Sequence, residues 1–273
     1  MRPTGLTYVV LFATLSAGCH ERTNPAAPGP PATTSPTMAS LVIAGANAML
    51  TGTSSNYYAT ATLSDGTTRT VTPNWSSSNS DVANVDNAGR LEGRVHGTTT
   101  VTATHDGMSA TKSVQVVNDY RGTWDGRFIV NGCDAPPGVC NSYEVDVFSF
   151  PIHLEILQTG NDLSEIRAKF LLASFQLRAE LIGRVSADGR LNLAGSAEMQ
   201  DRRGNAWATL HVGAWDTTLS GNGMMTGRWA QRLSRLQPLS NEIMENELET
   251  MTRTSDTITP VSASLGAPSR RSF

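Results

Sequence analysis

The sequence predicts an all-β protein, in which a β-sandwich is followed by an antiparallel meander that closes into a small up-and-down barrel. The first observation is composition. Aromatic residues make up only 6% of the chain, while Thr, Ser, Gly and Asn crowd its middle, a mixture that favours sheets over helices. The second is pattern, because short segments of alternating polarity recur with turn residues between them. The third is length: 273 residues exceed one typical domain, so we expect two domains with terminal tails.

The charge pattern argues against a nucleic-acid partner. The formal net charge is −3, and the basic residues are arginines except for Lys112 and Lys169. Acidic residues are interspersed among them, so no basic stripe forms along the chain. We therefore expect no nucleic acid among the partners.

Residues 1–18 are expected to be a signal peptide. Arg2 precedes an apolar run from Leu6 to Ala17, about 12 residues long, which is shorter than the ~20 residues that span a bilayer as a helix. A short apolar run after a basic residue is typical of a secretory signal. The sequence therefore predicts an exported protein.

The end of this run carries a candidate lipidation site at Cys19. The residues Leu15-Ser16-Ala17-Gly18-Cys19 resemble the lipobox of bacterial lipoproteins, in which the cysteine is diacylated and becomes the first residue after cleavage. Leu15 lies four residues before Cys19, whereas the family places this residue three before. The resemblance implies an anchor of two or three acyl chains, each methylene contributing roughly 0.8 kcal/mol of membrane binding. The alternative is an ordinary signal peptide cleaved near Ala17 or Gly18.

Residues 19–37 are predicted to form a tether. Prolines stand among Ala, Thr and Ser in this stretch, a composition that builds no core and favours extended, semi-rigid chain. Such a segment would separate the anchor from the first folded domain.

Cys133 and Cys140 are predicted to form a disulfide. They bracket the residues 134–139, which include Pro-Pro-Gly, in a chain that the signal sends to an oxidising compartment. Zinc would need further ligands, and neither a second cysteine pair nor a nearby histidine supplies them. We therefore expect a structural bridge, with no metal and no cofactor.

Residues 38–117 are predicted to form the sandwich. Segments 58–63 and 68–72 flank the turn Ser64-Asp65-Gly66-Thr67, in which the glycine can take positive φ, so they predict a hairpin. Trp75 is expected to supply the one large aromatic side chain of the core, because the apolar residues that follow it are smaller. His96 and His105 flank glycines and are expected to be solvated.

The same residues resemble a known family, the bacterial Ig-like domain, group 2. The resemblance rests on four runs in the family's order and spacing: Trp75-Ser76-Ser77-Ser78-Asn79, Val82-Ala83-Asn84-Val85-Asp86, Gly89-Arg90-Leu91 and Gly97-Thr98-Thr99-Thr100-Val101-Thr102-Ala103-Thr104. It implies an Ig-like sandwich of the type found in intimin- and invasin-like adhesins and other surface proteins. Such domains are mainly spacers, and no catalytic group is concentrated here.

Residues 119–252 are predicted to form the meander. Short turns connect the expected strands and permit only antiparallel neighbours, and about eight such strands can hide their edges by closing into a barrel. The expected strands are 122–130, 145–158, 163–172, 175–185, 190–199, 206–212, 217–221 and 224–232.

Two Gly-x-Trp elements of this domain resemble those of calycin-type barrels, the lipocalins and avidins. They are Gly122-Thr123-Trp124 and Gly227-Arg228-Trp229. The resemblance implies that Trp124 and Trp229 plug barrel ends, with Arg228 or Arg232 stacked on a ring. The alternative is that both tryptophans are ordinary core residues of an open sheet.

The candidate catalytic residues are few. His153 and Glu155 share one strand face, and His211 and Asp216 would approach across the sheet, which is the best acid–base or metal constellation in the sequence. Known nucleophile, zinc, phosphate and dinucleotide motifs do not occur. We therefore expect a protein that is not an enzyme. The hypothesis of an envelope hydrolase is less favoured than that of a binding protein.

For one segment of the C-terminal part, the sequence leaves two types of secondary structure open. Residues 241–245 are either a short helix capped by Ser240 or a last strand, and the glutamates that follow Pro238 are expected to form a solvated face. Residues 253–273 have hardly an apolar side chain to bury and are expected to be a disordered tail.

The order of these parts predicts an envelope protein. Anchor, tether, Ig-like spacer and terminal β-domain suit a non-enzymatic protein that presents the last domain for binding or adhesion. The absence of Asp after Cys19 is compatible with the outer membrane. The expected partners are the membrane, through the lipid, and an unidentified surface protein or glycan; the alternative is a small apolar ligand carried inside a closed barrel.

Overall fold

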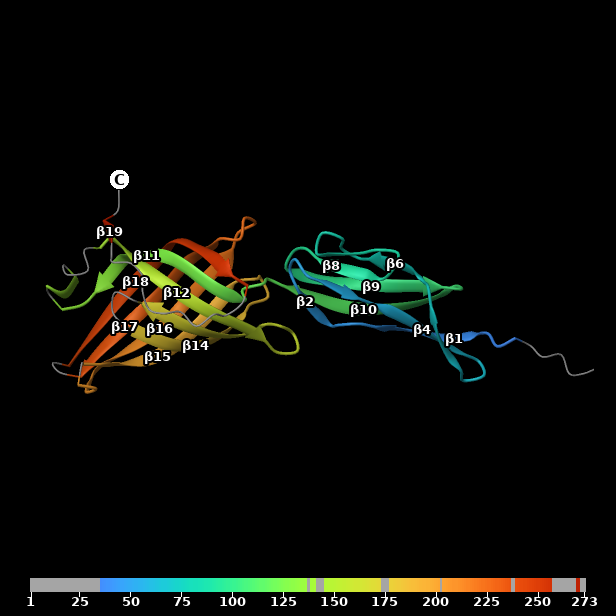
Figure 1. Ribbon diagram of the computed structural model, residues 1–273, viewed down its shortest axis with the longest axis horizontal. Helices are drawn as coiled ribbons and strands as arrows, with labels where there is room; N and C mark the ends of the chain where they lie inside the picture. The colour runs from blue at the N-terminus through green and yellow to red at the C-terminus, as the bar shows by residue number, and fades with distance from the viewer. Residues whose placement is uncertain are drawn as a thin grey trace, which may run out of the picture. The chain divides into compact units, whose positions relative to one another are not determined.

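The computed structural model describes residues 35–136, 138–140, 145–172, 177–201, 203–236, 239–256 and 269–270. The predicted signal peptide, Cys19 and nearly all of the tether lie outside these residues. None of the helices in the described ranges is long and apolar enough to cross a membrane. The structure is all-β, as the sequence predicts (Figure 1).

The first domain is a sandwich of short strands. Its three sheets have the strand orders β1-β4-β5, β2-β10-β9-β6 and β3-β8-β7. The predicted hairpin is present as β4 and β5, and Gly66 in its turn has a φ of +84°. The strands are β1 (Met38–Ala44), β2 (Ala48–Leu50), β3 (Ser54–Asn56), β4 (Tyr58–Leu63), β5 (Thr68–Val71), β6 (Asn74–Ser77), β7 (Ala83–Val85), β8 (Arg90–Gly93), β9 (Gly97–His105) and β10 (Met108–Val117).

The large aromatic residue of the sandwich core is Tyr57, and the prediction for Trp75 is wrong in this respect. Tyr57 is 1% exposed, and its hydroxyl donates a hydrogen bond to the Ala46 carbonyl at 2.6 Å. Trp75 packs against the same core but remains partly exposed. The phenol can be buried completely because its polar tip finds a backbone acceptor inside the domain.

The second domain is a closed antiparallel barrel. Strand β11 hydrogen-bonds to both β12 and β18, so the order β11-β18-β17-β16-β15-β14-β13-β12 returns to its start (Figure 1). The predicted closure is therefore correct. The strands are β11 (Gly122–Asp134), β12 (Phe148–Thr159), β13 (Glu165–Leu172), β14 (Leu177–Val185), β15 (Leu191–Gln200), β16 (Ala206–Leu219), β17 (Met225–Leu236) and β18 (Leu239–Ser255), and a short β19 (Ser269–Arg270) pairs with β12.

Two strands differ from the sequence prediction. The segment 206–212 and residues 217–219 of the segment 217–221 belong to one strand, β16. Its pairing shifts between Gly213 and Asp216, where Ala214 has a φ of +46°. A bulge of this kind keeps the strand paired on both sides of the irregularity. The last strand, β18, covers the region left open between helix and strand, and it continues through residues 253–255, which the sequence places in a disordered tail.

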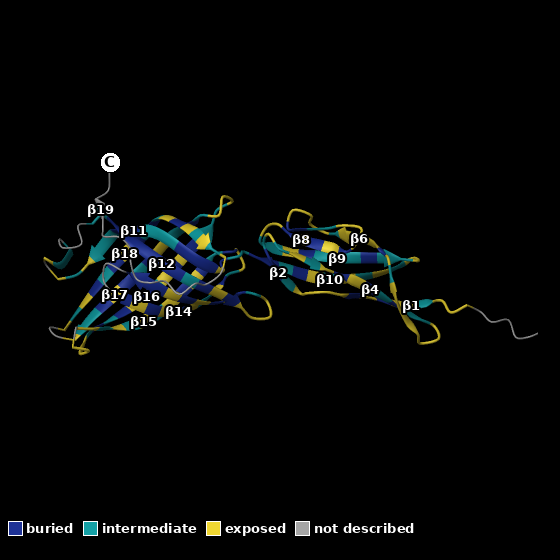
Figure 2. Ribbon diagram, viewed as in Figure 1, coloured by how far each residue is buried: buried dark blue, intermediate teal, exposed yellow. Residues whose placement is uncertain are grey.

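Buried positions alternate with more exposed ones along most barrel strands, as Figure 2 shows, whereas β12 is buried without a break from Ser149 to Leu154. The inward residues of β11–β18 form one apolar cluster, which also includes Leu50 and Val117 of the sandwich and Tyr120 of the linker. The two domains therefore share buried contacts at their junction.

Candidate functional site

The linker between the domains is held by hydrogen bonds from three sides. The Asn118 backbone N–H donates to Nδ1 of His96 in the sandwich at 3.3 Å, and its side-chain amide donates to the Gly189 carbonyl of the barrel at 2.9 Å. The carbonyl of Asn118 accepts a hydrogen bond from Nε2 of Gln158 at 2.9 Å. The backbone N–H, the backbone carbonyl and the side-chain nitrogen of Asn118 are thus all used in the junction.

Tyr120 and His96 extend this network, which we call the linker clamp (His96, Asn118, Tyr120, Gln158 and Gly189). The Tyr120 hydroxyl donates to the Gly189 carbonyl at 2.8 Å, and its N–H donates to Oε1 of Gln158 at 3.0 Å. Because Nδ1 of His96 accepts a hydrogen bond, its Nε2 carries the proton and donates to the Ala187 carbonyl at 3.0 Å. The expectation that His96 is simply solvated is therefore wrong.

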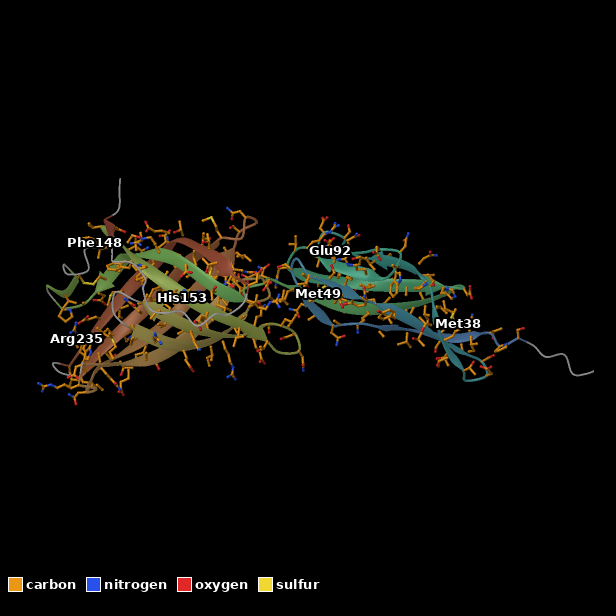
Figure 3. The ribbon with its side chains drawn as sticks, in the orientation of Figure 1. Met38, Met49, Glu92, Phe148, His153 and Arg235 are labelled. Atoms are coloured by element: carbon orange, nitrogen blue, oxygen red, sulfur yellow. A yellow bond between two sulfur atoms is a disulfide. The ribbon has the colours of Figure 1, made fainter. Side chains whose placement is uncertain are left out.

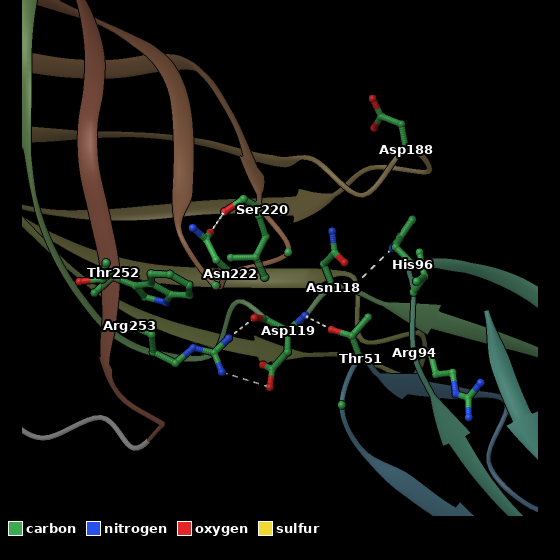
Figure 4. Close-up of a pocket in the computed structure, with 16 residues that line it drawn as sticks. Thr51, Arg94, His96, Asn118, Asp119, Asp188, Ser220, Asn222, Thr252 and Arg253 are labelled. Carbon is green, nitrogen blue, oxygen red and sulfur yellow. Dashed lines mark hydrogen bonds and ion pairs between the residues drawn. The ribbon is translucent and has the colours of Figure 1, made fainter. Parts of the chain in front are cut away.

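Beside the clamp lies an open cleft of about 820 Å³ (Figure 4). Both domains line it, and most of its side chains are polar or charged. The lining residues with polar side chains that Figure 4 labels are Thr51, Arg94, His96, Asn118, Asp119, Asp188, Ser220, Asn222, Thr252 and Arg253.

Trp124 is buried near this end of the barrel, which we call the linker end because β11 begins there. Its indole N–H donates to the Tyr120 carbonyl at 2.8 Å, and the guanidinium of Arg253 lies 5.0 Å from its ring centre. Asp119 accepts a hydrogen bond from Arg121 and forms an ion pair with Arg253. Burial alone would raise the pKa of Asp119, but these two arginines lower it below its ordinary value.

The other residues predicted for the barrel ends lie elsewhere. Arg228 is exposed on the outer face, where its guanidinium is 3.8 Å from Glu247, so it stacks on neither tryptophan. Trp229 lies inside the barrel among Phe128, Phe170 and Trp215. The cation on the Trp124 ring comes from the last strand, because only closure of the barrel brings Arg253 to the start of β11.

Aromatic rings fill the middle of the barrel. The Trp229 ring centre is 5.2 Å from that of Phe128, 5.3 Å from that of Phe170 and 5.5 Å from that of Trp215. Phe128 also packs on Phe150 at 5.5 Å. The centre therefore has no room for a ligand of drug size, which needs a cavity of roughly 300–1,000 Å³.

A small cavity of about 30 Å³ remains beyond these rings, toward the end where β17 turns into β18, which we call the hairpin end. Its lining is apolar except for one amide. The lining residues are Leu172, Leu177, Met199, Leu210, Gln231, Leu233 and Met244.

Three buried polar atoms of β17 and β18 have no hydrogen-bond partner within the part of the chain that the structure describes. They are Nε1 of Trp229, Oε1 of Gln231 and Oδ1 of Asn246. Trp229 pairs with Asn246 across the two strands, so these side chains are neighbours in the interior. The indoles of Trp124 and Trp215, in contrast, both donate to acceptors. Buried polar groups are usually satisfied, so this cluster needs an explanation.

The hairpin end also carries an inward ion pair. Nε of Arg235, whose side chain is labelled in Figure 3, is 2.5 Å from Oε1 of Glu242, which is 1% exposed. The Arg235 guanidinium lies 5.3 Å from the centre of the Trp207 ring. The expectation that these glutamates form one solvated face is therefore wrong for Glu242. Sequence reasoning missed it because the partner that permits its burial lies on another strand.

The candidate catalytic residues do not assemble into one site. Nδ1 of His153 is 2.6 Å from Oδ1 of Asp125, and Glu155 is 3.7 Å from Lys169. Asp216 pairs with Arg190, and His211 lies beyond the bulge of the same strand. No three His, Cys, Asp or Glu side chains within the described ranges are placed to hold a metal ion.

Cys133 and Cys140 are joined by a disulfide across residues with a sequence separation of seven. Cys133 lies near the end of β11, at the hairpin end of the barrel. The bridge therefore ties the end of β11 to the connection that follows it.

Comparison with known families identifies the first domain. Residues 38–116 match the bacterial Ig-like domain (group 2) family, which confirms the resemblance carried by the sequence motifs. A comparison with curated proteins finds no match.

Two solved structures of the surface layer protein SbsC are similar to the chain at a low level. The first, of domains 4–9, has a TM-score of 0.29 and 11% identity, and the match covers 78% of this chain and 31% of that chain. The second, of domains 5–6, has a TM-score of 0.28 and 12% identity, with 81% and 100% covered. Similarity at this level carries no information on function.

Proposed function

We propose that the chain is a lipid-anchored protein of the cell envelope that presents its C-terminal barrel for binding, without catalysis. The Ig-like domain supports a place at the cell surface, because domains of this type serve there mainly as spacers. Cys19 would hold the mature protein on the membrane, and the tether of residues 19–37 would separate the anchor from the spacer.

The observation that carries this proposal is the linker clamp. A flexible joint would let the barrel turn freely on the spacer, whereas hydrogen bonds from His96, Gln158 and Gly189 hold the short linker on both sides. Buried contacts of Leu50 and Val117 with the barrel cluster add to them. These contacts restrict rotation of the barrel on the spacer, which suits presentation of the barrel.

The cleft beside the clamp suits a polar macromolecular partner. Its volume of about 820 Å³ and its many donors and acceptors favour a surface protein or a glycan over an apolar ligand. The scattered positions of His153, Glu155, His211 and Asp216 favour binding over hydrolysis.

Membrane fractionation of Cys19→Ser tests the anchor. We expect the wild-type protein in the detergent-rich phase after detergent phase separation and the variant in the aqueous phase. Cys133→Ser is the matched control, since it also removes a cysteine but leaves the lipidation site, and it should partition like the wild type. Equal partitioning of Cys19→Ser and wild type would contradict the anchor.

Protease treatment of intact cells tests presentation. We expect cleavage of the surface-exposed turns when the barrel faces outward, and protection until the outer membrane is opened when it faces the periplasm. Retention of the protein in the cytosolic fraction would overturn the proposal.

A further inference from the structure

The hairpin end of the barrel interior has two unlike walls. Strands β13–β16 contribute Leu172, Leu177, Met199 and Leu210, all apolar. Strands β17 and β18 contribute, in successive inward pairs, Trp229 with Asn246, Gln231 with Met244, and Leu233 with Glu242. A barrel that needs only a core has no reason to place amides and a carboxylate inside, because burying such groups costs stability.

Gln231 is the polar group that faces the cavity. It is 6% exposed, its Oε1 has no partner within the described residues, and its Nε2 contacts only the thioether sulfur of Met244 at 3.1 Å. Sulfur is a weak acceptor, so the amide is poorly satisfied at both ends. Rotating the amide by 180° would exchange its oxygen and nitrogen. The nitrogen would then occupy the present position of Oε1, where it would have no hydrogen-bond partner.

A buried water does not account for this arrangement. A water held inside a protein usually makes two to four hydrogen bonds, and a cavity of about 30 Å³ is large enough for one. The lining, however, offers Gln231 as its single strong partner, and the other lining side chains are Leu or Met. The chemistry of the lining matches an apolar molecule with one hydrogen-bonding group.

Side chains that line the cavity can move to admit such a molecule. Met199 and Met244 lie on opposite walls, and methionine is unbranched, has three rotatable bonds and fills irregular space. Gln231 and Arg235 are four residues apart on β17, about 13 Å of strand, so a medium-length alkyl chain spans from the amide to the rim.

We propose that the hairpin end of the barrel is a binding site for the end of an amphipathic small molecule, an alkyl chain with one terminal hydroxyl or amide that pairs with Gln231. This inference rests on the proposed binding role of the barrel. The ligand enters with its polar end first, because the unpaired atoms lie deepest, and Met199 and Met244 move aside. The ion pair of Arg235 with Glu242 and the ring of Trp207 form the rim.

Titration of the full chain carrying Cys19→Ser with 1-octanol tests the site. The comparison compound is heptyl methyl ether, an isomer with the same atoms but no hydroxyl donor. In protein with ¹³C-labelled methionine methyls, we expect 1-octanol to shift the signals of Met199 and Met244 and to leave that of Met49, in the sandwich, unchanged. The ether should bind about tenfold more weakly, the effect of one hydrogen bond.

The variant Gln231→Leu separates a binding role from a structural one. We expect it to lower the 1-octanol affinity about tenfold and to leave the melting temperature equal or higher, because an unpaired buried amide is replaced by an apolar side chain. Leu157→Ala, on the outer face of β12, is the control and should keep the affinity of the parent.

The inference is overturned if 1-octanol leaves Met199 and Met244 unshifted up to its solubility limit, or if the two isomers and Gln231→Leu all behave alike. Neither result would bear on the proposed anchoring and presentation, because those are tested by fractionation and by protease treatment of cells.

Discussion

The guanidinium of Arg253 lies over the ring of Trp124, 5.0 Å from its centre, and also bonds to Asp119 in the linker. Trp124 belongs to the first strand of the barrel and Arg253 to the last. One side chain therefore joins the two strands that close the barrel, covers the ring at the linker end and connects both to the linker.

Replacement of Arg253 by Ala should destabilise the barrel by about 1–3 kcal/mol, because it removes a cation–π contact and charge-assisted hydrogen bonds. Urea unfolding followed by tryptophan fluorescence measures this loss. Arg228→Ala is the control, since Arg228 is exposed and makes one long surface ion pair, and it should change the stability by less than about 0.5 kcal/mol. Equal losses in the two variants would contradict the role given to Arg253.

Replacement of Gly189 by Ala should open the linker clamp. Gly189 has a φ of +82°, and a Cβ there would lie 2.9 Å from Nδ2 of Asn118 and 3.0 Å from Cγ of His96. We expect faster amide hydrogen exchange at Asn118 and Tyr120, which report the clamp directly.

Gly204→Ala is the matched control for this prediction. Gly204 has the same φ of +82°, but a Cβ there meets nothing within 4 Å. Both variants carry the backbone penalty of a left-handed alanine, roughly 1–2 kcal/mol, so they differ only in the steric clash at the junction. Faster exchange at the linker in both would show that strain in the barrel, and not the clash, opens the clamp.

The elements that the sequence predicts best are those specified by local chemistry. Residues 58–63 and 68–72 alternate and flank a turn with Gly66, and they form the hairpin β4–β5 almost as expected. The antiparallel meander was predictable because short turns force antiparallel neighbours, whereas its closure depends on the long-range pairing of β11 with β18. The bulge at Ala214 was not, since a residue at φ +46° leaves no mark in the alternation of side chains.

The last strand and the hairpin-end site could not be predicted because their polar residues face inward. Along β18 the buried positions are Glu242, Met244, Asn246, Leu248 and Met251, and two of them have side chains that a sequence pattern assigns to solvent. The burial of Glu242 depends on Arg235, a partner that only the pairing of β17 with β18 identifies.

In the sandwich, Tyr57→Phe should lower the free energy of unfolding by about 0.5–1.5 kcal/mol. The variant keeps the ring but removes the hydroxyl that donates to the Ala46 carbonyl, and it leaves that carbonyl unpaired. Chemical denaturation of the full chain, with the sandwich followed by the amide signals of β9 and β10, measures the change. Tyr58→Phe is the control, because Tyr58 is 55% exposed.

Stability should fall between about pH 10 and pH 12. Burial raises the pKa of both Tyr57 and Tyr120 to about 12, whereas an unfolded tyrosine titrates near 10. In this window the unfolded chain loses protons that the folded chain keeps, so the stabilisation present below pH 10 disappears as the pH rises toward 12. Urea midpoints measured from pH 8 to pH 12 test the trend.

The phenolate absorbance near 295 nm identifies the residues responsible. In Tyr57→Phe, the part of the absorbance step near pH 12 that belongs to Tyr57 should be missing and the fall of the urea midpoint should be smaller, whereas Tyr58→Phe should retain both. A late step of unchanged size in Tyr57→Phe would show that Tyr57 ionises like an exposed tyrosine.

The double variant Cys133→Ser/Cys140→Ser should destabilise the barrel by about 2–3 kcal/mol. The bridge closes a loop with a sequence separation of seven, and in the chain-entropy model removing it returns that much conformational freedom to the unfolded state. Urea unfolding of the oxidised protein and of the variant measures the difference, with Cys19→Ser as the control for loss of a cysteine elsewhere.

Because the bridge and the cavity lining lie at the same end of the barrel, the variant also tests whether the disulfide supports the proposed site. An unchanged 1-octanol affinity alongside the lower stability would separate the two roles.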